Sequence, residues 1–279
     1  MLRIFDMARG LRRHHGQTLI AAALAAACLP AWSPLAVAAD GAHAHSCTAP
    51  AGTVLPGLVL PRLAARIDRH EPVTIVALGS SSTAGAGATS PAMSYPSQLG
   101  SGLAQLLPDQ SVRVVNKGVN GEDVDDMLAR LQQDVLSESP DLVIWQTGTN
   151  SLLRHNDLTR YSARLQEGID RLHDAQIDLI LMDPQYAPLV TAIPAHSSMV
   201  ENIEAIGTRN RVPVFHRFAL MSYWARTMNA GYADLIAPDG LHMNDTSYKC
   251  MGQLLAATIA NSVQHRQPAT STAAGVLAK

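Results

Sequence analysis

The residues best suited to chemistry lie far apart in the chain. An Asp-Gly-Leu-His segment places Asp239 three residues before His242. At that spacing the carboxylate can accept a hydrogen bond from the imidazole of the same loop, which sets the tautomer and leaves the second ring nitrogen for a hydroxyl. One of three consecutive serines, at positions 80–82, can supply that hydroxyl. Because a serine hydroxyl is a poor nucleophile at neutral pH, it needs such a base.

Two glycine-containing segments are suited to binding a negatively charged oxygen. Gly118 and Gly121 permit a tight turn in the segment 116–121, and Asn150 closes the segment 148–150. A backbone N–H at the start of a helix and an asparagine amide are suitable donors to the oxyanion that forms when a nucleophile attacks a carbonyl group. The chain therefore holds candidate parts for acyl transfer.

Apolar runs that alternate with helical patterns must position these segments. The first run, residues 73–78, is β-branched and typical of a strand buried on both faces. The sequence predicts strands at residues 73–78, 112–115, 142–145, 179–182 and 212–215. Strands that alternate with helices predict an α/β fold, a three-layer α/β/α sandwich with a mostly parallel five-stranded sheet. Right-handed crossovers bring the carboxyl ends of the strands to one edge, so we expect the polar turns to converge there.

Four short blocks, in this order, resemble the SGNH (GDSL-type) serine hydrolases. The blocks are residues 79–85, 116–121, 148–150 and 239–242, and the resemblance spans residues 73–262. It implies Ser81 as the nucleophile, His242 as the base and Asp239 as the residue that orients the base. It also implies an oxyanion hole built from Gly121, the Asn150 amide and the backbone N–H of Ser81. The flavodoxin-like fold of this family agrees with the expected sheet.

The resemblance implies an enzyme that hydrolyses a carboxylic ester through an acyl-enzyme on Ser81, with no metal and no organic cofactor. Two departures from the family pattern leave alternatives open. Ser80 stands where the family usually has Asp, and Ser151 stands where Asp usually follows the block-three Asn. A glycan-binding module that has kept the fold without turnover is therefore a second interpretation. Ser80 and Ser82 are the alternatives to Ser81 as the nucleophile.

The N-terminus has the features of an export signal. A basic segment surrounds Arg12, residues 19–31 are apolar, and a small-x-small cleavage site ends at Ala38. We expect a signal peptide at residues 1–38 and a periplasmic or secreted mature chain. A membrane anchor is less favoured, because prolines interrupt the apolar run and the run is short for a span. Lipidation at Cys28 is a further alternative.

After the leader we expect three parts. Residues 39–70 are expected to form an arm and a short helix, residues 71–263 the hydrolase domain, and residues 264–279 a flexible tail. In an oxidising compartment the even pair Cys47 and Cys250 favours a disulfide between the arm and a C-terminal helix. Two independent buried thiols are the alternative.

Composition limits the partners. The formal net charge is -2, 16% of the residues are charged and 4% are aromatic, so neither a basic footprint nor stacking platforms for nucleic acid are expected. We also expect no stable membrane insertion once the leader is removed. The substrate is expected to be a small-molecule or glycan ester, and the absence of a long apolar lid favours O-acetyl groups on a glycan. An O-acyltransferase and a lysophospholipase- or thioesterase-like lipid or aryl esterase are the alternatives.

Overall fold

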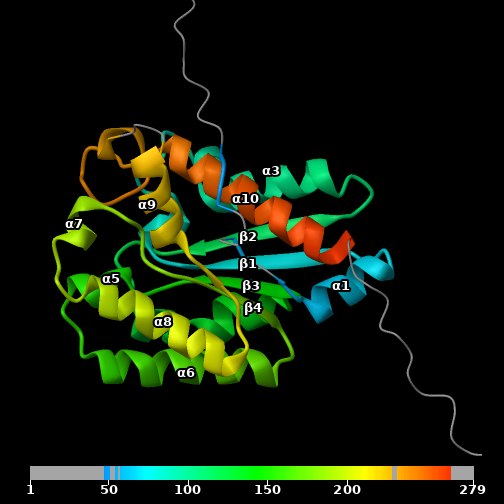
Figure 1. Ribbon diagram of the computed structural model, residues 1–279. Helices are drawn as coiled ribbons and strands as arrows, with labels where there is room; N and C mark the ends of the chain where they lie inside the picture. The colour runs from blue at the N-terminus through cyan, green and yellow to red at the C-terminus, as the bar shows by residue number, and fades with distance from the viewer. Residues whose placement is uncertain (1–46, 51–53, 56, 228–230, 265–279) are drawn as a thin grey trace, which may run out of the picture. The chain divides into compact units, whose positions relative to one another are not determined.

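The computed structural model describes residues 47–50, 54–55, 57–227 and 231–264. The expected signal peptide, part of the expected arm and the expected tail beyond Gln264 lie outside these residues. The described part holds a five-stranded sheet in the order β2-β1-β3-β4-β5, and each neighbouring pair of strands is parallel (Figure 1). This arrangement confirms the predicted sandwich.

The central strands of the sheet are buried on both faces. The strands are β1 (Val73–Gly79), β2 (Val112–Gly118), β3 (Leu142–Gln146), β4 (Asp178–Met182) and β5 (Val214–Phe215). Every residue of β3 and β4 is buried, as expected for mainly apolar strands between two helical layers. β2 is longer than predicted because its pairing with β1 continues up to the last residues, where Gly79 lies opposite Gly118.

Helices cover both faces of the sheet. α3 and α10 pack together on one face, while α6 and α8 lie together on the other (Figure 1). The α-helices are α1 (Pro61–Asp68), α2 (Ser81–Ala84), α3 (Tyr95–Leu106), α4 (Val124–Ala129), α5 (Thr149–Leu153), α6 (Leu158–Asp174), α7 (Pro188–Thr191), α8 (His196–Asn210), α9 (Arg217–Thr227) and α10 (Asp245–Gln264). The short helices α2, α5 and α7 begin within nine residues of a strand end, so they belong to the edge where the polar turns were expected.

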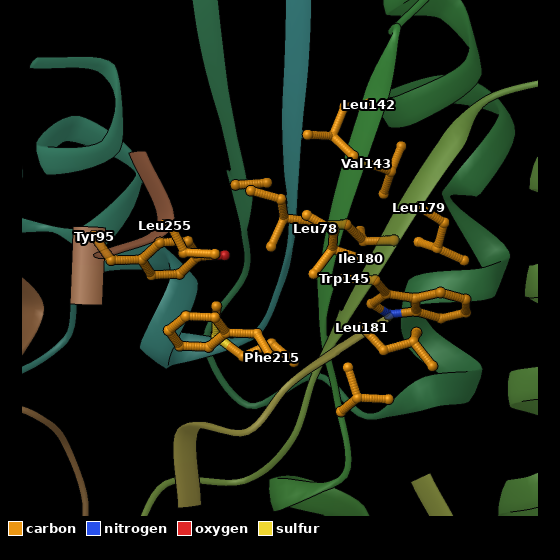
Figure 2. Close-up of a cluster of buried hydrophobic side chains, with 14 of the residues drawn as sticks. Leu78, Tyr95, Leu142, Val143, Trp145, Leu179, Ile180, Leu181, Phe215 and Leu255 are labelled. Carbon is orange, nitrogen blue, oxygen red and sulfur yellow. The ribbon is translucent and has the colours of Figure 1, made fainter. Parts of the chain in front are cut away.

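Side chains from both faces of the sheet form the hydrophobic core. Figure 2 shows Trp145 on one side of the strands and Tyr95 with Leu255 on the other. The Trp145 indole N–H points to the Met127 sulfur at 3.1 Å. A Cβ at Gly168 of α6 would lie 2.2 Å from the Trp145 ring, so α6 approaches the sheet as closely as it does only because this residue is glycine. The core therefore holds the helical layers tightly against the strands.

The helical segment after Gly121 is interrupted. α4 ends at Ala129, a π turn (Leu131–Val135) follows, and a 3-10 turn (Leu136–Glu138) ends the segment. The break falls at Arg130, whose side chain reaches back to carbonyl oxygens at the ends of two strands. Such π turns are frequent at functional sites.

A disulfide joins the arm to the last helix. Cys47 is bonded to Cys250 of α10 across 203 residues of sequence. Next to it, the Trp224 indole N–H donates a hydrogen bond to the carbonyl oxygen of Thr48 at 2.7 Å. The arm is therefore attached to both α9 and α10.

Replacing Cys47 and Cys250 with serine is expected to lower the free energy of unfolding by about 2–5 kcal/mol, because the crosslink restricts the unfolded chain. Chemical denaturation under oxidising conditions measures the difference. A reducing agent should destabilise the unsubstituted protein by a similar amount and leave the double variant unchanged. Equal stability of the two oxidised proteins would contradict the prediction.

Candidate active site

The four sequence blocks meet at the carboxyl edge of the sheet. The hydroxyl of Ser81, at the start of α2, lies 2.8 Å from Nε2 of His242. The other ring nitrogen of His242, Nδ1, lies 2.5 Å from a carboxylate oxygen of Asp239. Residues 161 positions apart in sequence are thus connected by one continuous set of hydrogen bonds. This is the geometry of a serine activated by an oriented imidazole.

The loop that carries the Asp and His residues is held internally. The second carboxylate oxygen of Asp239 accepts the backbone N–H groups of Leu241 and His242, both at 2.9 Å. An antiparallel bridge between Ile236 and Met243 closes the loop. Partial burial acts to raise the pKa of the Asp239 carboxyl, but the hydrogen bonds from the His242 ring and the backbone outweigh burial and lower this pKa. The group therefore stays a carboxylate at neutral pH, as the predicted orienting role requires.

Of the three consecutive serines, Ser81 is the one that contacts the imidazole. Ser80 is buried, and both its N–H and its hydroxyl donate to Oε1 of Gln146, at 2.9 and 3.1 Å. Thr83 donates to the same oxygen at 3.2 Å. Ser82 is also buried, with 1% of its surface exposed. The turn thus presents only the middle hydroxyl to His242.

Gln146 holds the serine turn in place, a role that was not predicted from the sequence. It ends the buried strand β3, and its side-chain oxygen accepts three hydrogen bonds from the serine turn. A polar residue that closes an otherwise apolar strand was the available signal, because a buried amide needs partners. With Ser80 in place of the usual Asp, the turn is held by this neutral amide from the neighbouring strand.

The glycine-rich loop after β2 lies directly against the serine turn. The Val119 N–H donates to the carbonyl oxygen of Gly79 at 3.0 Å. A Cβ at Gly118 would lie 2.1 Å from the backbone nitrogen of Ala84, so only glycine permits this approach. Gly121 has a φ of +81°, a conformation that favours glycine.

Asn150 and the Gly121 loop are brought together. One hydrogen of the Asn150 side-chain amide is donated to the carbonyl oxygen of Glu122 at 2.7 Å. The amide carries a second hydrogen, which this contact does not use. Within the described residues the backbone N–H of Gly121 also has no acceptor. Two of the three predicted oxyanion donors, Gly121 and Asn150, therefore have a hydrogen to offer to a ligand.

Two arginines, which the sequence argument also missed, hold this loop in place. Arg130 donates through one nitrogen to the carbonyl oxygens of Gly79, at 3.2 Å, and Lys117, at 2.9 Å. Arg154 donates to the carbonyl oxygen of Gly121 at 2.6 Å, and its other nitrogen pairs with Asp123 at 2.7 Å. Their role depends on contacts that are distant in sequence, so no local pattern indicates it.

Replacing Arg154 with alanine is expected to lower kcat for an ester substrate by about 10- to 100-fold, because a small displacement of an oxyanion donor is costly. Steady-state kinetics measure the effect. Arg160→Ala is the matched control, because Arg160 pairs with Asp125 and, among the described residues, makes no hydrogen bond to the Gly121 loop. Equal rates for the two variants would contradict a positioning role for Arg154.

Three further polar residues occupy the same edge. Gln185 connects the segment after β3 with the Asp239–His242 loop. Its side-chain oxygen accepts a hydrogen bond from the Thr149 hydroxyl at 2.9 Å, and its side-chain nitrogen donates to the Leu241 carbonyl oxygen at 3.1 Å. Asp183 is fully buried, and burial raises its pKa. Ser151 is buried and its hydroxyl has no partner among the described residues. Among those residues no three His, Cys, Asp or Glu side chains gather into a metal-binding group.

The family of the chain follows from comparison with known proteins. The model of the Non-GDSL lipase-like family matches residues 46–265, which is more than half of the chain. The chain belongs to the Non-GDSL lipase-like family, within the SGNH-type serine hydrolases. This confirms the resemblance of the four blocks. The roles of the individual site residues stay predictions.

A named relative and several solved structures are similar to this chain. An acetylxylan esterase from Geobacillus stearothermophilus is 34% identical over 94 residues, which are 30% of this chain and 43% of that enzyme. The match thus spans less than half of the relative. The structure of a lipase/acylhydrolase from Enterococcus faecalis aligns with a TM-score of 0.56 at 23% identity. The alignment covers 70% of this chain and 100% of that enzyme. The structure of a two-domain esterase active on acetylated mannans aligns with a TM-score of 0.60 at 18% identity. The alignment covers 75% of this chain and 55% of that esterase. At these identities the structures show a shared fold.

Proposed function

We propose that this chain is an exported serine esterase that removes small acyl groups, O-acetyl groups in particular, from a glycan. The observation that carries the proposal is the continuous hydrogen bonding from Asp239 through His242 to Ser81. No side-chain movement is needed for the proton of the serine to pass to the imidazole, because the two atoms already lie at 2.8 Å.

In the first step the Ser81 oxygen attacks the ester carbonyl carbon while Nε2 of His242 takes the hydroxyl proton. The Asp239 carboxylate keeps the proton of Nδ1 in place and stabilises the imidazolium that forms. The carbonyl oxygen becomes negatively charged and accepts hydrogen bonds from the N–H groups of Ser81 and Gly121 and from the Asn150 amide. His242 then returns its proton to the departing alcohol oxygen, which leaves an acyl group on Ser81.

Water completes the cycle. His242 takes a proton from a water molecule, whose oxygen attacks the acyl carbon of the ester on Ser81. The second oxyanion uses the same donors as the first. Its collapse breaks the bond to the Ser81 oxygen, which regains a proton from His242, and the carboxylic acid departs.

The names of the similar proteins support an acetylated glycan as the substrate. One relative is named an acetylxylan esterase, and one structural neighbour is described as active on acetylated mannans. Small acyl groups also agree with the absence of a long apolar lid from the sequence. An O-acyltransferase would use the same acyl-enzyme and differ only in the group that accepts the acyl.

Export is part of the proposal. A signal peptide at residues 1–38 would deliver the chain to the periplasm or the medium. The disulfide between Cys47 and Cys250 supports an oxidising compartment. Across the residues that the structure describes, no helix has the length and apolar character needed to cross a membrane. N-terminal sequencing of the mature protein tests the cleavage site.

A substrate panel tests the function. Purified protein is assayed on p-nitrophenyl esters of increasing acyl length and on acetylated xylan and mannan, with product analysis in the presence of a deacetylated glycan acceptor. We expect fastest hydrolysis of the acetyl ester and release of acetate from a polysaccharide. Acyl transfer to the acceptor in place of acetate release would favour the transferase. Failure to hydrolyse any ester would refute the enzymatic proposal.

A further inference from the structure

The partly exposed aromatic rings of this chain gather in one place. Within the described residues, most aromatic side chains are fully buried in the core: Tyr95, Trp145, Tyr161, Phe215, Trp224 and Tyr248. The exceptions are Tyr186, Phe218, Tyr223 and Tyr232. All of the exceptions but Tyr223 belong to a single group of stacked rings. In a chain with only 4% aromatic residues, this grouping requires an explanation.

The rings of the group contact one another in a continuous series. The His196 ring stacks on Phe218 with centroids 5.4 Å apart, and Phe218 meets the edge of Tyr186 at 5.3 Å and 85°. The Tyr186 ring stacks in turn on Tyr232, at 5.3 Å and 20°. Tyr232 is 37% exposed and is the outermost ring. We call Tyr186 and Tyr232, with Phe218 behind them, the aromatic stack.

The aromatic stack borders the loop that carries the proposed base. Gln185, the residue before Tyr186, donates a hydrogen bond to the carbonyl oxygen of Leu241, the residue before His242. Leu189, at the start of α7, donates its N–H to the Gly240 carbonyl oxygen at 3.1 Å. The segment that supplies Tyr186 thus contacts the Asp239–His242 loop on both sides of this tyrosine. In Figure 1, α7 and the orange loop before α10 lie at the same end of the sheet as α5.

The second tyrosine is attached to the same loop from its other side. Tyr232 lies in a 3-10 turn (Tyr232–Asp234), and the Ile236 N–H donates to the Tyr232 carbonyl oxygen at 2.7 Å. Ile236 forms the bridge with Met243 that closes the loop. The segments that carry the two tyrosines are therefore both connected to the Asp239–His242 loop by hydrogen bonds.

The chemistry of the aromatic stack suits a sugar ring. A pyranose offers a flat face of C–H groups surrounded by hydroxyls, and a tyrosine offers a rigid apolar face with a hydroxyl at its tip. Aliphatic side chains would bind an acyl chain equally well, whereas two tyrosines also supply polar groups. The rings are fixed by stacking on one another, so little side-chain freedom is lost on binding.

We propose that Tyr186 and Tyr232 form a stacking subsite for a sugar ring of the glycan, next to the sugar that carries the reacting ester. This inference rests on the proposed function. The subsite would contribute binding energy for the glycan and leave the hydrolytic machinery of Ser81 and His242 unchanged. Its occupancy would select extended acetylated glycans over small acetyl esters.

Kinetics on two substrates test the subsite. Tyr232→Ala is expected to raise KM for an acetylated xylo-oligosaccharide by about 3- to 10-fold, the effect of one lost ring contact. Its kcat/KM for p-nitrophenyl acetate should stay within about twofold of the unsubstituted value. Tyr232→Phe, which keeps the ring, should retain most of the affinity. Tyr223→Ala, the partly buried ring outside the aromatic stack, is the matched control and should leave KM for the oligosaccharide unchanged.

A binding measurement keeps the test independent of turnover. In the Ser81→Ala background, calorimetric titration with the same oligosaccharide should show weaker binding when Tyr186→Leu is added, with thermal melting as a check of folding. Equal binding with and without the tyrosines, or an equal loss on both substrates, would overturn the subsite. Hydrolysis of p-nitrophenyl acetate without any activity on acetylated xylan or mannan would overturn the sugar assignment and leave the esterase intact. If the unsubstituted protein hydrolyses neither p-nitrophenyl acetate nor an acetylated glycan, the proposed function itself is refuted.

Discussion

Ser81→Ala is expected to lower kcat for p-nitrophenyl acetate by about 10⁴-fold or more, because the variant has no nucleophile from which an acyl-enzyme can form. The Ser81 hydroxyl makes a partly buried hydrogen bond with His242 and no other side-chain hydrogen bond among the described residues, so the variant should fold normally. Steady-state kinetics and thermal melting of the two proteins measure both effects. A fluorophosphonate probe should label the unsubstituted protein and leave the variant unlabelled.

Ser80→Ala is the matched control for this prediction. Ser80 is the neighbouring candidate, but its hydroxyl donates to Gln146 and makes no contact with the imidazole. We expect the Ser80 variant to keep probe labelling and to lose no more than about tenfold in kcat through a less well held turn. Retained activity in purified Ser81→Ala would contradict the assignment of Ser81 as the nucleophile. A loss of kcat in Ser80→Ala as large as that in the Ser81 variant would contradict it as well. A binding module without turnover would show no labelling in any of the three proteins.

Asn150→Ala is expected to lower kcat by about 10²–10³-fold with little change in KM, the usual effect of removing one oxyanion donor. The physical reason is that a hydrogen bond from the amide to the carbonyl oxygen becomes stronger only as negative charge develops on that oxygen. Affinity for a boronic acid that mimics the tetrahedral intermediate should fall together with kcat. The kinetics and the inhibition constant are measured on the same preparation.

The contact between Asn150 and Glu122 offers a competing, purely structural role for this residue. Asn156→Ala separates the two interpretations, because Asn156 supports the same region through Asp123 at 2.9 Å and is not one of the predicted oxyanion donors. A structural role predicts similar losses of stability and activity in both variants. An oxyanion role predicts a large loss of kcat in the Asn150 variant alone. Unchanged boronate affinity in Asn150→Ala would refute the oxyanion role.

Hydrophobic patterns within single segments were sufficient to predict the fold class. The apolar runs that become β1, β3 and β4 are buried on both faces, and burial on both faces leaves a continuous hydrophobic signature. The end of β2 was placed too early, because Asn116 and Lys117 are polar and their strand conformation comes from pairing with β1. The helix after Gly121 breaks at Arg130, whose side chain contacts carbonyl oxygens of other segments, and no local pattern indicates such contacts.

The supports of the site had no local signature. Gln146 holds the serine turn from 66 residues away, and Arg154 holds the Gly121 loop from 33 residues away. Each of these contacts depends on the distance between strand ends and on the direction of a side chain. A sequence read segment by segment contains neither quantity. The same holds for the stacking of Tyr186 on Tyr232.

By itself the sequence determined the order of strands and helices, the edge at which the polar turns meet, and the four blocks that include Ser81, Asn150 and His242. Hydrophobic periodicity and short catalytic motifs are local properties, so they can be read directly. Only the tertiary structure decided which serine faces the imidazole, which residues hold the oxyanion loop and where the aromatic rings gather. These depend on packing between distant segments, because a hydrogen bond or a ring contact forms only when two side chains are brought within a few ångströms of one another.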